Sequence, residues 1–534
     1  MSGRASRSRV ARGAVRRPPR GAAHTTTVDL ERYRGIVPEW GPFVEAASRP
    51  EPTVLRVRTG KMSERDLLGR LGEQGFRLRP IEGLPGFHQV EDGPFPASLT
   101  LEHWLGLFYV QQASTGVAAP ALAPVPGERV LDMCAAPGGK TSHLAELMAD
   151  RGCLVASEMS ESRIRGLLGN VYRLGHPNVL AVAGDGRRFP EGALFDRVLV
   201  DAPCSGEGTL RCRAGKAPRQ SRGFAGYVTG TQRALLERAI RLTRPGGTVL
   251  YVTCTFAPEE NEAVVDAVLG RMPVEVEPLH LPVPHASGIT AFAGARYHPS
   301  LEGAARIYPH HFDSGGLFLA RLRRLDGHLR DDAGWSPVPS LFPGEGGSSR
   351  EESWPPGDAR ATSGAGTIGT GGIERPLAGV RAELAERWGV EDAGLEDAEW
   401  IMRGGRLWLH TAREWPLESW AEGGWRAISL GLRAAELDAR GRARPTNDFL
   451  RWADARVRAG ILDVDRGGLE RLLGREAVPV EAGDPEAERR GPVALRFQGA
   501  VIGRGALTAR GLVSEIPKAR AADLARVLAE SRGG

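Results

Sequence analysis

Between residues 127 and 325, short apolar runs alternate with longer segments in which apolar residues recur every three to four positions. The runs predict buried strands, and the periodic segments predict helices. Their alternation is typical of an α/β fold with a doubly wound, mostly parallel sheet. The predicted strands are Arg129–Met133, Cys153–Glu158, Asn178–Ala183, Phe195–Asp201, Thr248–Thr253 and Leu317–Leu322, and the predicted helices lie near residues 141–150, 161–174, 231–243 and 259–270.

Two segments lack such patterns. Residues 1–28 hold seven arginines in their first twenty positions and no acidic residue, which predicts a disordered basic tail that touches nucleic acid without sequence preference. A mitochondrial transit peptide is the less favoured alternative, because no amphipathic helical pattern is present. Residues 326–375 are rich in Gly, Ser and Pro and predict a flexible linker.

Two further folded units flank the α/β region, since 534 residues are too many for one hydrophobic core. Residues 29–126 predict a small α+β domain, with a helix face through Leu67, Leu68 and Leu71 and a helix or strand–helix segment at Leu101–Ser114. Residues 376–534 predict a second α+β unit. Its expected elements are helices at Val380–Trp388 and Asn447–Ala459 and a hairpin-like ending.

Composition narrows the class of protein. No apolar run approaches the roughly 18–20 residues that span a bilayer, and no hydrophobic stretch follows the N-terminal arginines as in a signal peptide. The five cysteines are odd in number and show no C-x-x-C spacing, so neither a disulfide framework nor a zinc site is expected. The net charge of +5 permits a polyanionic partner. We expect a cytoplasmic protein with no metal and no membrane association.

The segment RVLDMCAAPGGKT, from Arg129 to Thr141, combines a predicted strand, a glycine turn and the start of a helix. Free N–H groups at such a helix N-terminus favour an anionic ligand. It matches neither a phosphate loop nor the dinucleotide fingerprint. Glu158 ends the next strand, where an acid accepts ribose hydroxyls, and Asp185 follows the third, where a carboxylate can receive an exocyclic amine. This order of groups predicts a site for S-adenosylmethionine.

Two cysteines follow neighbouring predicted strands, Cys204 in DAPCSGEG and Cys254 in TCT. Open α/β sheets bind ligands at these strand ends. Carbon-5 of a pyrimidine accepts a methyl group only after a thiolate has added to carbon-6, and a base must then remove the carbon-5 proton. A thiol pair beside a methyl-donor site therefore predicts pyrimidine methylation, and the residues alone do not say which cysteine attacks.

Four motifs resemble those of the Nop/Sun family of RNA cytosine-C5 methyltransferases: VLDMCAAPGGKT, DAPCSGEG, VTCTFAPEENE and RIYPHHFDSGGLFLARL. The resemblance covers roughly residues 60–325 and implies a Rossmann-like methyltransferase domain. It also implies that Cys254 is the nucleophile and that Cys204 helps to release the product. The cofactor contacts that it implies are Cys134, Ala135, Ala136, Pro137, Gly138, Gly139, Lys140, Glu158, Asp185 and Asp201. Arg163, on the helix after Glu158, is expected either to contact the cofactor or to support a residue that does.

The roles of two of these residues are not fixed by the resemblance. Asp201 could instead orient the cytosine edge. Glu158 stands where the family usually has Asp, which keeps the carboxylate but lengthens its reach.

The C-terminal stretch GAVIGRGALTARGLVSEIPKARAADL resembles the PUA-like RNA-binding tail of bacterial RsmF-type enzymes, with Lys518 in the IPKAR part. This implies small-subunit ribosomal RNA as substrate, either free or within the subunit, and transfer RNA is the alternative. Arg211–Arg222 carries five cations and no acid directly after the DAPC motif, and we expect it to contact RNA phosphates. A non-catalytic ribosome-assembly factor is the competing hypothesis, and the intact Cys204, Cys254 and Lys140 argue against it.

Overall fold

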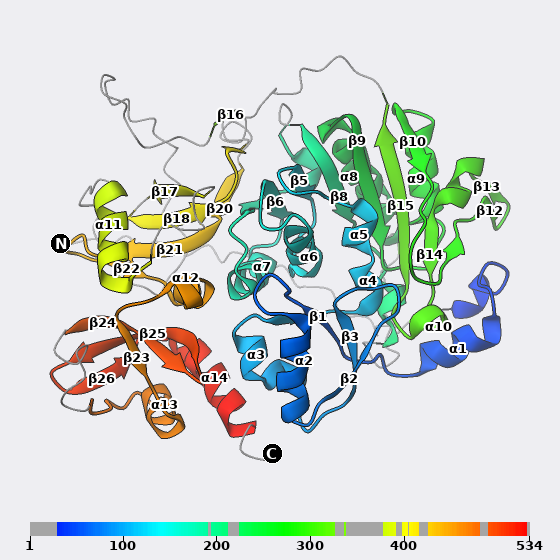
Figure 1. Ribbon diagram of the computed structural model, residues 1–534. Coiled ribbons are helices and arrows are strands. Elements are labelled where there is room, and N and C mark those ends of the chain that lie inside the picture. The colour runs from blue at the N-terminus through cyan, green and yellow to red at the C-terminus, as the bar shows by residue number, and fades with distance from the viewer. Residues whose placement is uncertain are drawn as a thin grey trace, which may run out of the picture.

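A computed structural model describes residues 29–190, 194–211, 224–325, 336–337, 377–390, 398–403, 405–415, 425–480 and 490–530. The predicted basic tail, residues 212–223 and nearly all of the predicted linker lie outside these ranges. Within the described residues the largest element is a ten-stranded mixed sheet (Figure 1). Helices cover both of its faces, and three smaller α+β layers surround it.

The centre of the large sheet is parallel, with strand order β9-β8-β5-β6-β7. This confirms the predicted Rossmann-like arrangement. The bounds of these strands are β5 Arg129–Asp132, β6 Cys153–Glu158, β7 Val179–Ala183, β8 Phe195–Asp201 and β9 Thr243–Thr253. Beyond β9 the sheet continues with antiparallel strands, namely β15 Leu317–Arg324, β14 Ala305–Ile307 and β11 Ala286–Ser287, and β10 Val274–Glu277 also pairs with β15.

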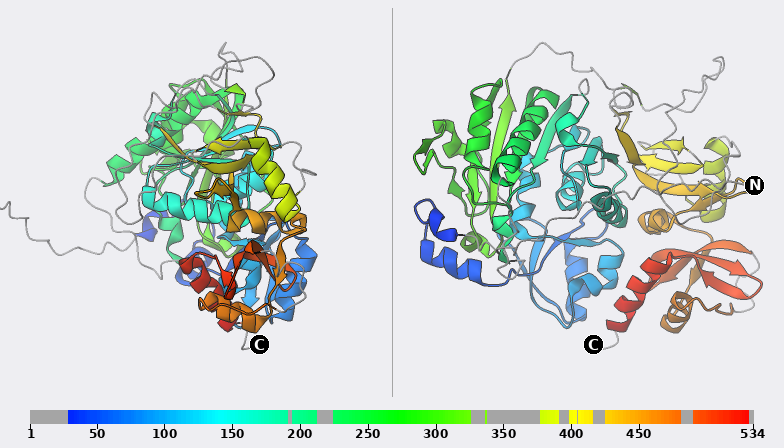
Figure 2. Two further views of the ribbon diagram at one scale, coloured as in Figure 1. Left: turned by 90° about the vertical axis from the view of Figure 1, so that its left-hand side faces the viewer. Right: turned by 180° about the vertical axis from the view of Figure 1, so that it is seen from behind.

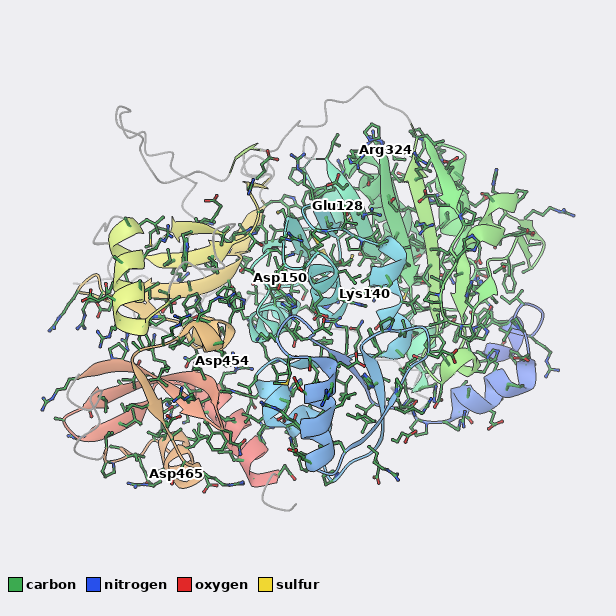
Figure 3. The ribbon with its side chains drawn as sticks, viewed as in Figure 1. Glu128, Lys140, Asp150, Arg324, Asp454 and Asp465 are labelled. Carbon is green, nitrogen blue, oxygen red and sulfur yellow. The ribbon has the colours of Figure 1, made fainter. Side chains whose placement is uncertain are left out.

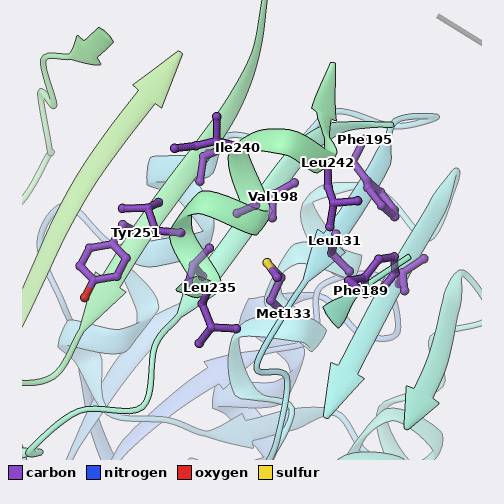
Figure 4. Close-up of a cluster of buried hydrophobic side chains, with 14 of the residues drawn as sticks. Leu131, Met133, Phe189, Phe195, Val198, Leu235, Ile240, Leu242 and Tyr251 are labelled. Carbon is purple, nitrogen blue, oxygen red and sulfur yellow. The ribbon is translucent and has the colours of Figure 1, made fainter. Parts of the chain in front are cut away.

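Alternation along the strands divides the core between the two faces of the sheet, because successive side chains point to opposite sides. Leu131 packs on one face with Leu235 and Ile240 (Figure 4). Val130 packs on the other with Leu144 and Leu167. The covering helices are α5 Ala118–Leu122, α6 Gly139–Leu147 and α7 Glu161–Leu174 on one side and α8 Phe224–Leu242 and α9 Glu262–Leu269 on the other.

The first α+β layer is a four-stranded antiparallel sheet of order β2-β3-β1-β4. Leu67 and Leu71 are buried as predicted, and the segment from Leu101 to Ser114 divides into a helix, a strand and the start of another helix. Its elements are β1 Val54–Val57, α2 Glu64–Glu73, β2 Arg77–Pro80, β3 Phe87–Asp92, α3 Leu101–Trp104, β4 Phe108–Val110 and α4 Ala113–Gly116.

The preceding segment packs elsewhere. The 3₁₀ turn Leu30–Tyr33 and helix α1, Trp40–Ser48, bury Tyr33 and Phe43 against Phe256 and Tyr308 of the large domain. The contact is aromatic: Phe43 packs edge-to-face on Phe256 and on Tyr308. No local sequence pattern predicts this packing.

Two small sheets follow the linker, in strand orders β17-β18-β21-β22 and β23-β24-β25-β26. The predicted helix Asn447–Ala459 ends earlier, at Ala453, where the next residue, Asp454 (Figure 3), accepts a 2.8 Å hydrogen bond from the backbone N–H of Val501. The elements are α11 Leu377–Trp388, β17 Glu399–Arg403, β18 Arg406–His410, β21 Leu432–Leu437, β22 Ala443–Pro445, α12 Asn447–Ala453, β23 Ile461–Asp463, α13 Arg466–Leu473, β24 Gly491–Phe497, β25 Ala500–Thr508, β26 Gly511–Ser514 and α14 Lys518–Glu530.

The C-terminal part touches both other parts of the chain. Strand β20, Arg426–Leu430, pairs antiparallel with β7 at the edge of the large sheet, an extension that the sequence did not predict. Leu524 of α14 belongs to the same buried cluster as Leu67 of α2, so the second small sheet packs on the N-terminal layer. The view from behind in Figure 2 shows α14 running beside that layer.

Candidate active site

The glycine turn follows β5 and ends in α6. Gly138 has φ +104, a left-handed conformation that costs other residues energy, and α6 begins at Gly139 rather than at the predicted Thr141. Thr141 Oγ1 donates a 2.8 Å hydrogen bond to Asp132 Oδ2 at the end of β5. Burial raises the pKa of Asp132 to about 7, although this hydrogen bond opposes the shift. The buried carboxyl group of Asp132 therefore anchors the start of α6, and with it the glycine turn, to the end of β5.

A pocket of about 210 Å³ lies between this turn and the N-terminal layer. Its walls are Cys134, Ala135, Ala136, Pro137, Gly139 and Lys140 from the turn, Asp132 and Asp201 from the strand ends, and Tyr109, Val110, Gln111, Gln112 and Thr115 from β4 and α4. A side chain at Gly139 would place Cβ 3.2 Å from the Tyr109 ring, so the glycine permits this close approach. Seven predicted cofactor residues of the turn and β8 thus face one cavity: Cys134, Ala135, Ala136, Pro137, Gly139, Lys140 and Asp201.

Arg56 of β1 joins the two walls. Its fully buried guanidinium donates to Gln111 Oε1 at 2.6 Å, to the Gly139 carbonyl at 2.8 Å and to Ser142 Oγ at 2.7 Å. It also lies 3.2 Å from Glu146 Oε1 on α6. Sequence reasoning missed Arg56, Tyr109 and Gln111, because they lie upstream of every recognised motif.

The two predicted acids stand on the next strands and do not line this pocket. Glu158 is buried at the end of β6, accepts a 2.8 Å hydrogen bond from the N–H of Ser160 through Oε1, and has Oε2 3.1 Å from Arg163 Nη1. Arg163 in turn donates to the Ala136 carbonyl at 2.5 Å, which connects this acid to the glycine turn. Asp185 is held by Arg187, 2.6 Å from Nη2, and the hydrogen bonds lower the pKa of Asp185.

Lys140 and Asp201 form an ion pair, with Nζ 2.7 Å from Oδ2. Burial alone would lower the pKa of Lys140, but the Asp201 carboxylate and Cys254 reverse this and raise it. Lys140 therefore stays charged at the start of α6, between the sheet and the N-terminal layer (Figure 3). A fixed positive charge stands beside the strand ends that carry the cysteines.

The predicted cysteine pair is assembled. Strands β8 and β9 are parallel neighbours with Asp201 opposite Val252, so the residues that follow them meet. Cys204 Sγ and Cys254 Sγ lie 3.3 Å apart, and both thiols are free. The hydrogen bond from Cys204 lowers the pKa of Cys254, and Lys140 lowers it further, whereas the same contact and burial raise the pKa of Cys204. These surroundings favour the thiolate at Cys254 over that at Cys204.

Buried acids fix the loops that carry these cysteines. Glu260 Oε2 accepts from the Ser205 N–H and from Gln232 Nε2, each at 2.9 Å. Glu207 Oε2 accepts from Tyr33 Oη at 2.7 Å and from Thr255 Oγ1 at 3.1 Å. Glu207 lies in the DAPCSGEG motif and Glu260 in VTCTFAPEENE. The sequence did not predict these contacts; for the PEENE segment it predicted only the start of a helix. That segment forms a turn instead, and α9 begins three residues later than predicted, at Glu262.

Two of the remaining cysteines are unsuited to attack. Burial raises the pKa of Cys134 well above its usual value and that of Cys153 to about 12. Cys212 and the rest of the basic loop lie outside the described residues, but its first cation, Arg211, is buried and bonded to Asp313, 2.6 Å away, and to the Ser314 carbonyl at 2.9 Å. Arg211 therefore contacts protein rather than solvent.

Within the described ranges, no cluster of three or more His, Cys, Asp or Glu side chains could hold a metal ion. In the same part of the chain, no helix is both long and apolar enough to cross a membrane.

The mixed sheet and the glycine turn at its parallel centre define a Rossmann-like methyltransferase fold. A solved structure titled as a methyltransferase homolog protein from Pyrococcus horikoshii agrees. It is 34% identical, covers 55% of this chain and 94% of its own, and superposes with a TM-score of 0.50.

Residues 119–323 match the sequence profile described as 16S rRNA methyltransferase RsmB/F. The matched part of the chain is therefore similar to this family, and the curated relatives below include RsmF-type members of the Nop/Sun methyltransferases.

Two curated relatives carry names that specify a substrate. The "Ribosomal RNA small subunit methyltransferase F" of Erwinia tasmaniensis is 39% identical over 311 residues, 55% of this chain and 63% of that protein. The human "28S rRNA (cytosine(4447)-C(5))-methyltransferase" is 38% identical over 299 residues, 54% of this chain and 36% of that protein. The chain thus spans less than two thirds of the length of these relatives.

Proposed function

We propose that this protein transfers a methyl group from S-adenosylmethionine to carbon-5 of a cytosine in small-subunit ribosomal RNA. The observation that carries the proposal is the free thiol pair, 3.3 Å apart and adjacent to the Lys140–Asp201 ion pair. A non-catalytic RNA-binding factor would have no need of this arrangement. The name of the Erwinia relative supports the small subunit as the source of the RNA, and the name of the human relative supports carbon-5 of a ribosomal RNA cytosine as the target atom.

The residues present fit the methyl donor. Glu158 Oε2 is buried and accepts no aligned hydrogen bond, although Arg163 Nη1 lies 3.1 Å away, so it can still accept from ribose hydroxyls. The glycine turn leaves backbone N–H groups for a carboxylate. When bound, S-adenosylmethionine supplies the methyl group as an electrophile. Cys134 to Lys140, Glu158, Arg163 and Asp185 are the residues that hold it in this proposal. Asp201 either joins them or orients the cytosine.

Cys254 performs the covalent step. Its thiolate adds to carbon-6 of the cytosine, and the electron pair that this addition places on carbon-5 makes that atom nucleophilic. After methylation a base removes the carbon-5 proton, the carbon-5–carbon-6 double bond re-forms, and the bond to sulfur breaks. Cys204 keeps its proton while Cys254 attacks, and it assists the release from 3.3 Å away.

The cytosine has to leave its stack to reach these thiols. In this proposal the C-terminal part is a PUA-like RNA-binding unit, the loop from residue 212 to 222 contacts phosphates, and the protein works in the cytoplasm on the free RNA or on the small subunit. The positions of the thiols at the strand ends, rather than within the core, support access by an extruded base.

Bisulfite sequencing of RNA from a deletion strain tests the proposal. We expect at least one 5-methylcytosine of 16S ribosomal RNA to vanish and to return with the wild-type gene but not with Cys254→Ala. If a 5-methylcytosine of transfer RNA is lost instead, transfer RNA is the substrate. Unchanged 5-methylcytosine at every site would overturn the proposal.

A further inference from the structure

A second pocket, of about 200 Å³, lies where the N-terminal layer meets both small C-terminal sheets. Trp104 of α3 forms one wall, and the others come from β21, α12, β25 and the start of α14. In Figure 1 these elements converge below the large sheet. Neither cysteine of the active site nor any residue of the glycine turn lines it.

The walls are rich in arginine. Arg433, Arg451, Arg504 and Arg520 each come from a different element. The three acids of the pocket are already paired, Glu436 with Arg433 at 3.2 Å, Asp448 with Arg451, and Glu515 with Arg504 at 2.6 Å. Arg520 has no ion pair among the described residues. Its guanidinium lies 4.6 Å from the centroid of the Trp104 ring.

Other donors there also lack partners. Trp104 is 5% exposed and its Nε1–H has no hydrogen-bond acceptor, and the same holds for Nε of the buried Arg451. Arg520 stands in the first turn of α14, where the first N–H groups of a helix have no acceptor within it and its dipole favours negative charge. Because buried donors without acceptors are costly, this set of groups calls for an oxygen-rich anion.

We propose that this pocket binds a phosphate group of the RNA backbone, as a second contact remote from the cysteine pair. The inference rests on the proposed RNA substrate. Arginine forks match phosphate oxygens in geometry, and the pocket is several times the roughly 30 Å³ occupied by one water, so it admits more than a monatomic ion. Trp104 and Tyr109 belong to one short stretch, so a phosphate bound here orients the RNA relative to the methyl-transfer pocket.

Equilibrium binding of a 16S ribosomal RNA transcript to the full chain, without methyl donor, tests the proposal. We expect Arg520→Ala to weaken binding about five- to twentyfold and to flatten the salt dependence by the equivalent of one phosphate, about 0.7 to 1 in slope. Arg526→Ala is the matched control, since Arg526 is an exposed residue of the same helix that pairs with Asp523 at 2.7 Å. It should bind like the wild type.

Kinetics provide the second readout. Arg520→Ala should raise KM for RNA and leave kcat unchanged, because the cysteines are untouched. Equal binding by Arg520→Ala and Arg526→Ala would overturn the proposal. Absence of methylation by the wild type would overturn the proposed function instead, and the binding assay would still report on the pocket.

A further variant covers the case in which Arg520→Ala fails to fold. Trp104→Phe keeps an aromatic side chain beside Arg520 but replaces the indole by a smaller ring without the Nε1 donor, and we expect RNA binding about two- to tenfold weaker. Wild-type affinity in Trp104→Phe would then overturn the proposal. Inorganic phosphate and uridine monophosphate are the last probes. Either of them could raise the melting temperature of the wild type while Arg520→Ala binds RNA normally. In that case the pocket binds a free anion, and the proposed RNA contact is wrong.

Discussion

Cys204 and Cys254 place their sulfur atoms 3.3 Å apart without a disulfide bond, at the ends of adjacent parallel strands. Their surroundings differ. The pKa of Cys254 is lowered by the hydrogen bond from Cys204 and by Lys140, while Glu260 adds to the causes that raise the pKa of Cys204. These opposite shifts support the proposed roles, in which Cys254 attacks and Cys204 holds a proton.

Replacing the two cysteines should separate their roles. Cys254→Ala should abolish methylation, because the raised pKa of the neighbouring Cys204 keeps that thiol protonated. Cys204→Ala should accumulate a covalent RNA adduct, visible as a shifted band on a denaturing gel. Cys153→Ala, a core substitution in β6, serves as the control and should give neither effect. Activity in Cys254→Ala, together with no adduct in Cys204→Ala, would contradict the assignment.

The reactivity of Cys254 should depend on pH through its neighbour. Alkylation of Cys254 by iodoacetamide, followed by mass spectrometry of its peptide, should fall as pH decreases through a pKa below the usual 8.5 or so of a free thiol. In Cys204→Ala the pKa of Cys254 should rise, since the hydrogen bond that stabilises the thiolate is lost. Identical midpoints in the two proteins would show that the pair is not coupled in this way.

Glu158 should determine affinity for the methyl donor. Glu158→Gln removes the charge that we propose accepts ribose hydroxyls, and we expect S-adenosylmethionine to bind about ten- to a hundredfold more weakly by calorimetry. Glu161→Gln is the control, because Glu161 is exposed nearby, pairs with Arg426 at 3.2 Å and does not line the pocket at the glycine turn. Unchanged affinity in Glu158→Gln would remove Glu158 from the cofactor site.

Asp132 should make the stability of the protein pH-dependent. Burial raises its pKa from 3.8 to about 7 in the folded state, so the folded protein holds a proton that the unfolded chain has lost. This contribution is complete below about pH 4 and disappears as pH rises through 7. Urea denaturation between pH 5 and 8 should show a loss of up to about 3 kcal/mol that Asp132→Asn lacks. If the free energy of unfolding depends on pH in the same way in the wild type and in Asp132→Asn, this role of Asp132 is refuted.

Arg56 should be needed for stability as well as for the pocket. Arg56→Ala leaves the Gly139 carbonyl, Ser142 and Glu146 without their buried partner, and we expect a loss of about 3–5 kcal/mol in the free energy of unfolding. Arg65→Ala, an exposed change in the same layer, should stay within about 0.5 kcal/mol of the wild type. A small effect of Arg56→Ala would mean that water replaces the guanidinium.

The sequence predicted the parts of the molecule that are local. Buried strands such as β7 are continuous apolar runs. Cys204 and Cys254 could be placed together because parallel strands end at one edge. Arg56 contacts Gly139 across 83 positions of the chain, and no periodicity carries such information. The segment before α9 misled because Glu260 and Asn261 use their side chains in tertiary hydrogen bonds instead of opening the helix.

Strand β20 has a consequence for how the chain can be divided. It hydrogen-bonds along β7, which otherwise forms the open margin of the large sheet, and Trp425 beside it packs on Phe189 with ring centroids 4.6 Å apart. An open margin invites pairing with another chain. A shortened chain that stops before the C-terminal part would keep Cys204 and Cys254 but leave β7 as an unpaired edge strand. We therefore expect the shortened chain to aggregate more readily than the full chain.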